Sequence, residues 1–175
     1  MKNIVLIGFM GTGKSTVGKR LARRLNYAFI DTDQAIEEIT GLTVSQIFAK
    51  HGFKRFRGEE ALLASKLADK ERLVIATGGG LVLNSGNVEK MQRNGVLICL
   101  EASPEAICRR VKNKRNRPLL AKGNLMVTVQ RLLKERQSAY EMAELTVNTD
   151  KLSPEEIVDR IIQFMLERGY WGENC

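Results

Sequence analysis

The feature that most constrains this chain is a glycine-rich loop between an apolar segment and a helical pattern. The run Asn3-Ile-Val-Leu-Ile7 leads directly into Gly8-Phe-Met-Gly-Thr-Gly-Lys14-Ser15. These residues match the spacing G-x-x-x-x-G-K-[ST], in which the glycines let successive backbone N–H groups face an anion. The helix expected after the loop adds the positive end of its dipole. The pattern predicts a phosphate-binding loop in which Lys14 reaches the β- and γ-phosphates and Ser15 ligates Mg²⁺.

Strand patterns alternate with helical patterns along the rest of the chain. Short apolar runs predict four further strands, at 28–30, 73–76, 96–100 and 145–147. This alternation predicts the α/β class, with a central parallel sheet of about five strands and helices on both faces, a three-layer α/β/α arrangement. The length of 175 residues suits one domain, covering 1–175.

Capping signals and apolar spacing predict where several helices begin. Thr43 with Gln46 is a candidate capping box, and Ser153 with Pro154 opens the last helix. Two further helices are expected at about 54–69 and 125–142.

Three groups of polar or glycine residues directly follow predicted strands. They are the loop that begins at Gly8, the pair Asp31 and Asp33, and the triple glycine 78–80. Parallel sheets bind their ligands at the carboxyl ends of the strands. We therefore expect these three loops to line one crevice.

Asp31 and Asp33 are two residues apart at the end of the second predicted strand. On an extended strand end they point to the same side, where one carboxylate holds Mg²⁺ and the other faces a substrate hydroxyl. The alternative is that one or both cap the next helix. The third strand ends at Thr77 without the acid that often holds the metal near such a loop, which favours Asp31 for that role.

Arg57 and Glu60 lie three residues apart on one helical face. Such a pair is usually a surface ion pair that contributes little stability. The functional interpretation is that Glu60 directs Arg57 toward an anionic substrate.

The basic residues are concentrated in one segment. The chain has 28 Lys+Arg and 20 Asp+Glu, a formal net charge of +8, and seven of the basic residues lie between Arg109 and Lys122 without an acid or aromatic residue among them. A nucleic-acid-binding surface would spread its charge and interleave aromatic side chains. The segment indicates either a solvated loop or a mobile clamp on a small anion, and we expect no nucleic-acid partner.

The sequence also predicts the compartment. No apolar run approaches the roughly 20 residues of a membrane helix. The three cysteines form no CxxC pair, and the first strand pattern begins almost at Met1, which leaves no room for a targeting segment. We expect a cytoplasmic protein with no membrane partner, acting as a monomer.

Taken together, the motifs resemble those of the shikimate kinase family from Ile4 to about Leu166. They are GFMGTGKSTVG at 8–18, DTD at 31–33, FRGEE at 56–60, TGGG at 77–80, RNRPLL at 115–120 and ERQSAYEMA at 135–143. The resemblance implies a P-loop kinase fold with substrate-binding helices at about 32–60 and a mobile lid at about 112–124. It implies transfer of the γ-phosphoryl group of ATP to the 3-hydroxyl of shikimate, in aromatic amino-acid biosynthesis.

The resemblance also implies residue roles, with Mg²⁺ as cofactor and ATP and shikimate as small-molecule partners. Catalysis is assigned to Lys14, Asp33 and Arg117, and the metal to Ser15 and Asp31. Nucleotide binding is assigned to Gly11, Thr12, Gly13, Lys14, Ser15 and Thr16, to Arg117 in the lid, and to Arg110 (with Arg109 as the alternative) and Pro154 beside the adenine. Shikimate binding is assigned to Asp33, Arg57, Gly79, Gly80 and Arg136.

Two other functions fit parts of the pattern. A gluconate-type or nucleoside-monophosphate kinase would share the loop and the fold but take another acceptor, and the DTD, FRGEE and TGGG segments argue against it. A P-loop binding module without catalysis would hold nucleotide or polynucleotide without turning over shikimate. The intact set of Lys14, Ser15, Asp33, Arg57 and Arg136 argues against that function.

Overall fold

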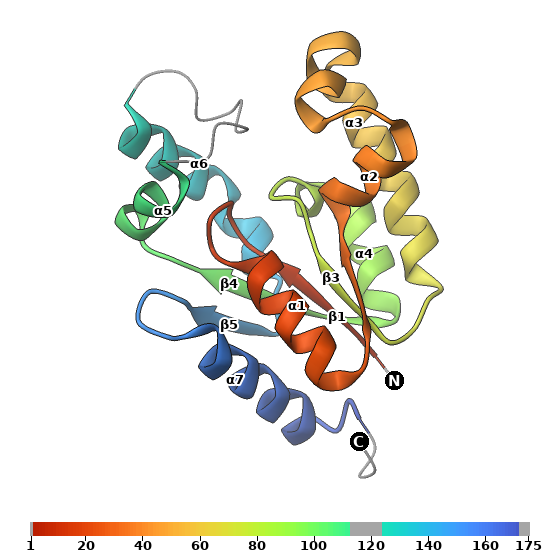
Figure 1. Cartoon of the computed structure of the whole chain (residues 1–175), viewed down its shortest axis with the longest axis vertical. Coiled ribbons are helices and arrows are strands. Elements are labelled where there is room, and N and C mark those ends of the chain that lie inside the picture. Colours follow the sequence, from red (N-terminus) through yellow and green to blue (C-terminus); the bar gives the residue numbers. More distant parts are fainter. Residues whose placement is uncertain (1, 113–123, 172–175) are drawn as a thin grey trace.

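A five-stranded sheet forms the centre of the computed structural model, which describes residues 2–112 and 124–171 (Figure 1). The strands are β1 (Asn3–Ile7), β2 (Ala28–Asp31), β3 (Leu73–Ala76), β4 (Gly95–Glu101) and β5 (Leu145–Asn148). Their order across the sheet is β2-β3-β1-β4-β5, and every neighbouring pair is parallel. The predicted parallel sheet is confirmed, and β1, which carries the glycine-rich loop, is its central strand.

Helices cover both faces of this sheet, as predicted. They are α1 (Lys14–Leu25), α2 (Thr32–Thr40), α3 (Val44–Ala68), α4 (Ser85–Arg93), α5 (Pro104–Val111), α6 (Leu125–Tyr140) and α7 (Pro154–Glu167), with a 3-10 turn, η1, at Leu81–Leu83. Among the described residues, none of the helices is both long and apolar enough to cross a membrane.

The alternation of side chains along β1 explains why both faces are covered. Ile4 and Leu6 belong to a buried cluster with α1 and α7, whereas Val5 and Ile7 belong to a second cluster with α3, α4 and α6. Successive side chains of a strand point to opposite faces, and all four of these residues are fully buried. A strand that is apolar at every position therefore requires a layer of helices on each side.

Most helix starts agree with the sequence, and one helix, α4, differs. Both predicted caps are present, and the Thr43–Gln46 pair forms a complete capping box. The two helices expected between Thr43 and Asp69 are confirmed as the two parts of α3, which meet at a kink where Gly52 has non-helical backbone angles (φ +75°). Helix α4 was not predicted, because only Val88 and Met91 of its apolar residues are buried and two positions establish no helical period.

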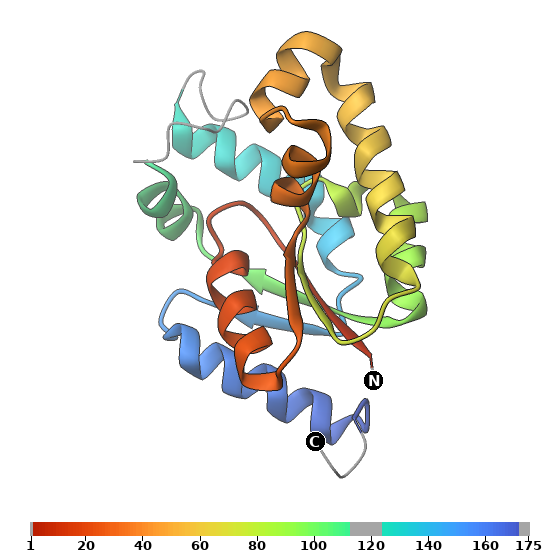
Figure 2. The same cartoon turned by 45° about the vertical axis from the view of Figure 1, so that its right-hand side comes forward.

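The topology brings helices from distant parts of the chain to one end of the sheet. Figure 1 shows α2 and the start of α3 on one side of the carboxyl ends of the strands and α6 on the other, and Figure 2 shows the same helices at this end of the sheet after a turn of 45°. Segments from the first and last thirds of the chain therefore lie on either side of this end of the sheet.

Candidate active site

A cleft of about 510 Å³ opens at the carboxyl ends of β1, β2 and β3. The glycine-rich loop at 10–17, both carboxylates (Asp31 and Asp33) and the segment 77–79 line it. The predicted convergence of three loops is therefore confirmed. Arg110 and Pro154, which the family resemblance implies to lie beside the adenine, line the same cleft.

The loop between β1 and α1 has the backbone of an anion cradle. Gly13 caps α1 with φ +97°, and nothing lies within 4 Å of the position that a Cβ would take there, so its backbone conformation and not a lack of space requires glycine. The Lys14 ammonium donates hydrogen bonds to the carbonyl oxygens of Gly8 (2.8 Å) and Phe9 (2.9 Å). Lys14 is therefore held within the loop, at the start of α1, where an anion is favoured.

The Asp31 carboxylate connects this loop to α2. Its Oδ2 accepts a hydrogen bond from Ser15 Oγ at 2.7 Å, and its Oδ1 accepts from the backbone N–H groups of Asp33 (3.2 Å) and Gln34 (3.4 Å). The expectation that both carboxylates lie on an extended strand end is wrong, because α2 begins at Thr32 and Asp33 lies in its first turn. Asp31 is the N-cap of that helix, and both carboxylates still line the cleft.

The Ser15–Asp31 pair has the chemistry of a partial Mg²⁺ site. Mg²⁺ prefers oxygen ligands and is usually held by one or two protein groups together with water and substrate phosphates. In residues 2–112 and 124–171, no cluster of three or more His, Cys, Asp or Glu side chains is arranged to hold a metal. The hydroxyl and carboxylate oxygens at the phosphate loop fit a cation that arrives with a nucleotide.

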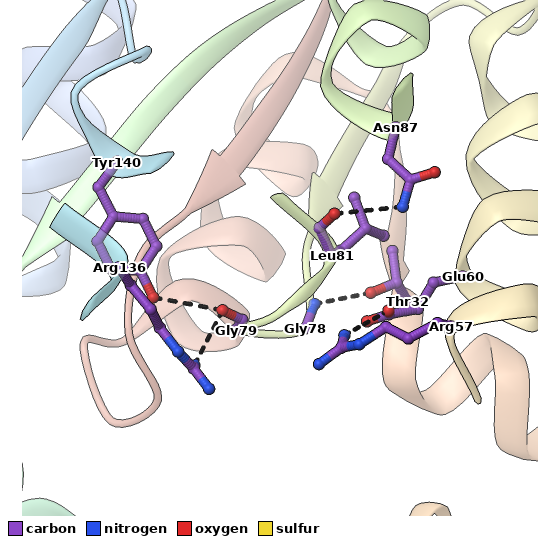
Figure 3. Close-up of polar contacts among 9 residues, drawn as sticks. All are labelled: Thr32, Arg57, Glu60, Gly78, Gly79, Leu81, Asn87, Arg136 and Tyr140. Carbon is purple, nitrogen blue, oxygen red and sulfur yellow. Dashed lines mark hydrogen bonds and ion pairs between the residues drawn. The ribbon is translucent and has the colours of Figure 1, made fainter. Parts of the chain in front are cut away.

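Two arginines from distant parts of the chain flank the triple glycine (Figure 3). Arg57 of α3 pairs with Glu60, with 2.5 Å between Nη1 and Oε2. Arg136 of α6 donates from Nη1 to the carbonyl oxygen of Gly79 at 3.1 Å, and the Tyr140 hydroxyl donates to the same oxygen at 3.3 Å. The two guanidinium groups reach toward this backbone from opposite sides, an arrangement that suits a planar anion.

Glu60 is a buried carboxylate beneath Arg57. It is 0% exposed, and its Oε1 has no hydrogen-bond partner within the described part of the chain. Burial raises its pKa above the ordinary value of 4.5, and the hydrogen bond and charge of Arg57 oppose that shift. Because one carboxylate oxygen binds Arg57 and the whole group is enclosed, Glu60 restricts the positions that the Arg57 guanidinium can take.

We expect Glu60→Gln to change how stability depends on pH. A raised pKa means that the folded chain binds this proton more tightly than the unfolded chain does. The contribution of Glu60 is therefore most favourable below pH 4.5 and is lost as the pH rises through its folded pKa, by about 1.4 kcal/mol for each pH unit that separates the folded pKa from the unfolded one. Glutamine has no such loss. Urea unfolding at several pH values should show the variant gaining stability relative to the parent as the pH rises, and a constant difference would contradict this.

Arg110 joins the nucleotide loop to the segment after β5. Its guanidinium donates to Thr149 Oγ1 and to the Thr149 carbonyl, both at 2.9 Å, and to the Gly11 carbonyl at 3.4 Å. Pro154 stands at the first position of α7 beside this cluster. Arg117 and the expected lid at 112–124 lie almost entirely outside the described residues.

Some residues of the site carry no sequence signal. Thr32, Gly78, Tyr140 and Thr149 each make a hydrogen bond that joins distant segments at or beside the cleft. Their partners are 46, 61 and 39 residues away in the chain, so no local pattern marks them. Thr32, Gly78 and Tyr140 lie inside the DTD, TGGG and ERQSAYEMA segments, whereas Thr149 lies in none of the quoted motifs.

Comparison with known proteins gives one consistent result. The family model described as "Shikimate kinase" matches residues 10–166. The chain is 61% identical to the shikimate kinase of Pelotomaculum thermopropionicum (97% of this chain, 99% of the relative) and 53% identical to that of Desulforudis audaxviator (97% and 89%). A solved structure, the shikimate kinase from Acinetobacter baumannii in complex with shikimate, is 35% identical with a TM-score of 0.92 and covers 98% of this chain and 96% of its own.

Proposed function

This chain belongs to the shikimate kinase family, and from that membership we propose which of its residues carry the reaction. The protein is an ATP-dependent kinase acting on shikimate. It transfers the γ-phosphoryl group of ATP to the 3-hydroxyl of shikimate and releases ADP and shikimate 3-phosphate. The observation that carries the residue assignment is the meeting of the phosphate cleft, Asp33 and the two arginines at the segment 78–80.

The loop between β1 and α1 binds the phosphates of ATP. Its backbone N–H groups and the Lys14 ammonium surround the β- and γ-phosphates, and Lys14 exchanges its carbonyl partners for phosphate oxygens when ATP arrives. Ser15 and Asp31 hold Mg²⁺, which neutralises phosphate charge when bound. Residues 11–16 contribute the cradle, Arg110 and Pro154 flank the adenine, and Arg117 acts on the γ-phosphate.

Shikimate lies against the segment 78–80. Arg57 and Arg136 bind its carboxylate, because a guanidinium fork matches two carboxylate oxygens. Gly79 and Gly80 let the backbone approach the ring. Asp33 accepts a hydrogen bond from the hydroxyl that attacks the γ-phosphate. Since the transition state of phosphoryl transfer is loose, Asp33 contributes more by orienting this hydroxyl than by removing its proton early.

We further propose the number of domains, the compartment and the oligomeric state of the protein. Both hydrophobic clusters pack on one sheet, which supports a single domain over 1–175 with its substrate-binding part at 32–60. The enzyme works in the cytoplasm as a monomer on two small molecules, without a nucleic-acid or membrane partner. Light scattering of the purified protein, with and without both substrates, tests the monomer.

A coupled assay of ADP release tests the function. The enzyme with Mg·ATP is incubated with shikimate, gluconate, AMP or CMP, and the acceptor is analysed by mass spectrometry. We expect ADP formation only with shikimate, together with the gain of one phosphoryl group on it. Turnover with another acceptor would keep the phosphate site and reject the shikimate site. ATP binding without turnover of any acceptor would indicate a binding module.

Tyr140→Phe tests how the Gly79 carbonyl contributes to shikimate binding. Burial raises the pKa of Tyr140, so its hydroxyl stays protonated and donates to that carbonyl. The peptide bond is planar, so fixing the Gly79 carbonyl also fixes the direction of the Gly80 N–H. We expect the KM for shikimate to rise about 3- to 10-fold, the range of one neutral hydrogen bond, with the KM for ATP unchanged.

A matched control for this variant is Tyr170→Phe. The Tyr170 hydroxyl also donates to a partner, the Glu144 carboxylate, but neither residue lines the cleft. This control should leave both KM values unchanged. An equal rise of the shikimate KM in the two variants would show that hydroxyl loss acts through general destabilisation.

A further inference from the structure

The backbone conformation of the three residues at 78–80 does not require glycine. None of them is among the glycines with positive φ, so an ordinary side chain is compatible with each backbone. Glycine is needed there because a Cβ atom would contact neighbouring side chains.

Each of these glycines faces a different charged side chain. A Cβ on Gly78 would meet the Asp33 carboxylate, with Cγ at 3.0 Å and Oδ1 closer still. A Cβ on Gly80 would lie 2.8 Å from Arg57 Cζ, and one on Gly79 would lie 3.3 Å from Arg136 Nη1. The contacts at Gly78 and Gly80 are tighter than real Cβ atoms show, whereas the contact at Gly79 is only a crowded one.

The backbone at Gly78 is held from both sides, so it cannot retreat from such a contact. Its N–H donates to Thr32 Oγ1 at 2.8 Å (Figure 3), and its carbonyl accepts from the Leu81 N–H at 3.2 Å. Thr32 is fully buried as the first residue of α2, directly before Asp33. One hydrogen bond therefore fixes the glycine against the helical turn that carries the carboxylate.

We propose that Gly78 is a positioning residue for Asp33. Held by Thr32, Gly78 leaves free the space that the Asp33 carboxylate occupies and so sets where that carboxylate meets the acceptor hydroxyl. This inference rests on the proposed role of Asp33 in orienting that hydroxyl.

A methyl group at position 78 should affect catalysis and not the stability of the fold. The atoms that a methyl group at position 78 would displace are the end of a side chain, which moves by rotation about its own bonds. Folding should therefore tolerate the change, while the carboxylate shifts by about 1 Å, a displacement that costs roughly 10²-fold in rate at a reacting centre.

The primary test is Gly78→Ala in the full chain. We expect kcat with shikimate to fall about 10²-fold, with the melting temperature and the affinity for ATP close to those of the parent. Gly86→Ala is the matched control, because its Cβ would also press on a side-chain oxygen, Asn84 Oδ1 at 3.2 Å, away from the cleft. A kcat of Gly78→Ala within threefold of the parent overturns the inference.

Gly80→Ala separates the two glycines by the kinetic parameter that changes. Its methyl group meets the Arg57 guanidinium, a group for substrate capture, so the KM for shikimate should rise more than kcat falls. If Gly78→Ala and Gly80→Ala change kcat and KM in the same proportion, the two glycines do not act through different side chains, and the inference is wrong.

A double-mutant cycle with Asp33→Ala tests whether Gly78 acts through Asp33. Without the carboxylate, the methyl group has nothing to displace, so adding Gly78→Ala should change the residual rate by less than about threefold. A further 10²-fold loss in this background overturns the inference. If Asp33→Ala alone keeps the parental kcat, the proposed function of Asp33 fails, a result distinct from failure at Gly78.

Thr32 supplies a second route if Gly78→Ala does not fold. Thr32→Val keeps the shape of the side chain but removes the acceptor for the Gly78 N–H, whereas Thr32→Ser keeps that acceptor. We expect kcat to fall about 10-fold in the valine variant, the loss of one hydrogen bond, and to recover in the serine variant. Equal kcat values in the two variants would contradict a positioning role for this contact.

Discussion

Asp33→Asn is expected to lower kcat by about 10³-fold, within the range for loss of a positioned proton acceptor. Asparagine has nearly the same shape but carries no charge, and its N–H₂ group donates where the carboxylate accepts. The acceptor hydroxyl then loses the partner that directs its lone pair at the γ-phosphate. ATP binding should be unchanged, because the phosphate cradle is built from the β1–α1 loop and Lys14.

The comparison of binding with turnover makes this test specific. Nucleotide affinity by calorimetry and kcat by coupled ADP release are measured on the same preparation. Asp69→Asn, at the exposed end of α3, is the control for a charge change outside the cleft. A kcat for Asp33→Asn within threefold of the parent would show that Asp33 neither orients nor deprotonates the hydroxyl.

The local parts of this site could be predicted from the sequence because their chemistry is contiguous. The phosphate loop with its Lys14 and Ser15, the capping box of α3, and the start of α7 at Ser153 and Pro154 depend on residues within a few positions of each other. Their geometry follows from backbone rules that act over one turn. For the same reason, the five apolar strand runs predicted the sheet.

The prediction of the Asp31–Asp33 geometry was wrong because α2 begins between the two residues, at Thr32. If the strand continued, both carboxylates would point to one side, but Asp31 caps α2 and Asp33 follows in its first turn. A strand end and a helix N-terminus with the same residues cannot be distinguished by spacing alone. The alternative that one of them caps the next helix is therefore confirmed for Asp31.

The contacts that complete the site could not be predicted, because they join segments that only the fold brings together. Gly78 bonds to Thr32 across 46 residues, and Tyr140 to Gly79 across 61. The order β2-β3-β1 places the end of β3 between α2 and the glycine-rich loop. The triple glycine thus contacts side chains from three helices, and its role in the site depends on where those helices lie.

Arg136→Ala is expected to lower kcat/KM for shikimate by about 10²- to 10³-fold, the cost of removing one partner from a buried charged contact. Arg136 is only 6% exposed, and its guanidinium lies 5.5 Å from the centre of the Phe9 ring. Gly79 accepts one of its hydrogen bonds, which leaves the rest of the fork for a carboxylate. The KM for ATP should change less than twofold, because Arg136 does not line the phosphate cleft.

Arg136→Lys separates charge from geometry. Lysine keeps the positive charge but cannot form two parallel hydrogen bonds with a carboxylate, so it should recover only part of the loss. Arg131→Ala, on the same helix in an exposed pair with Glu135, should leave both substrates unaffected. In the proposed site Arg57 and Arg136 bind one carboxylate from opposite sides, so removing both should cost less than the sum of the single losses in free energy. An equal loss of kcat/KM for ATP and for shikimate in Arg136→Ala would instead show that this arginine stabilises the cleft as a whole.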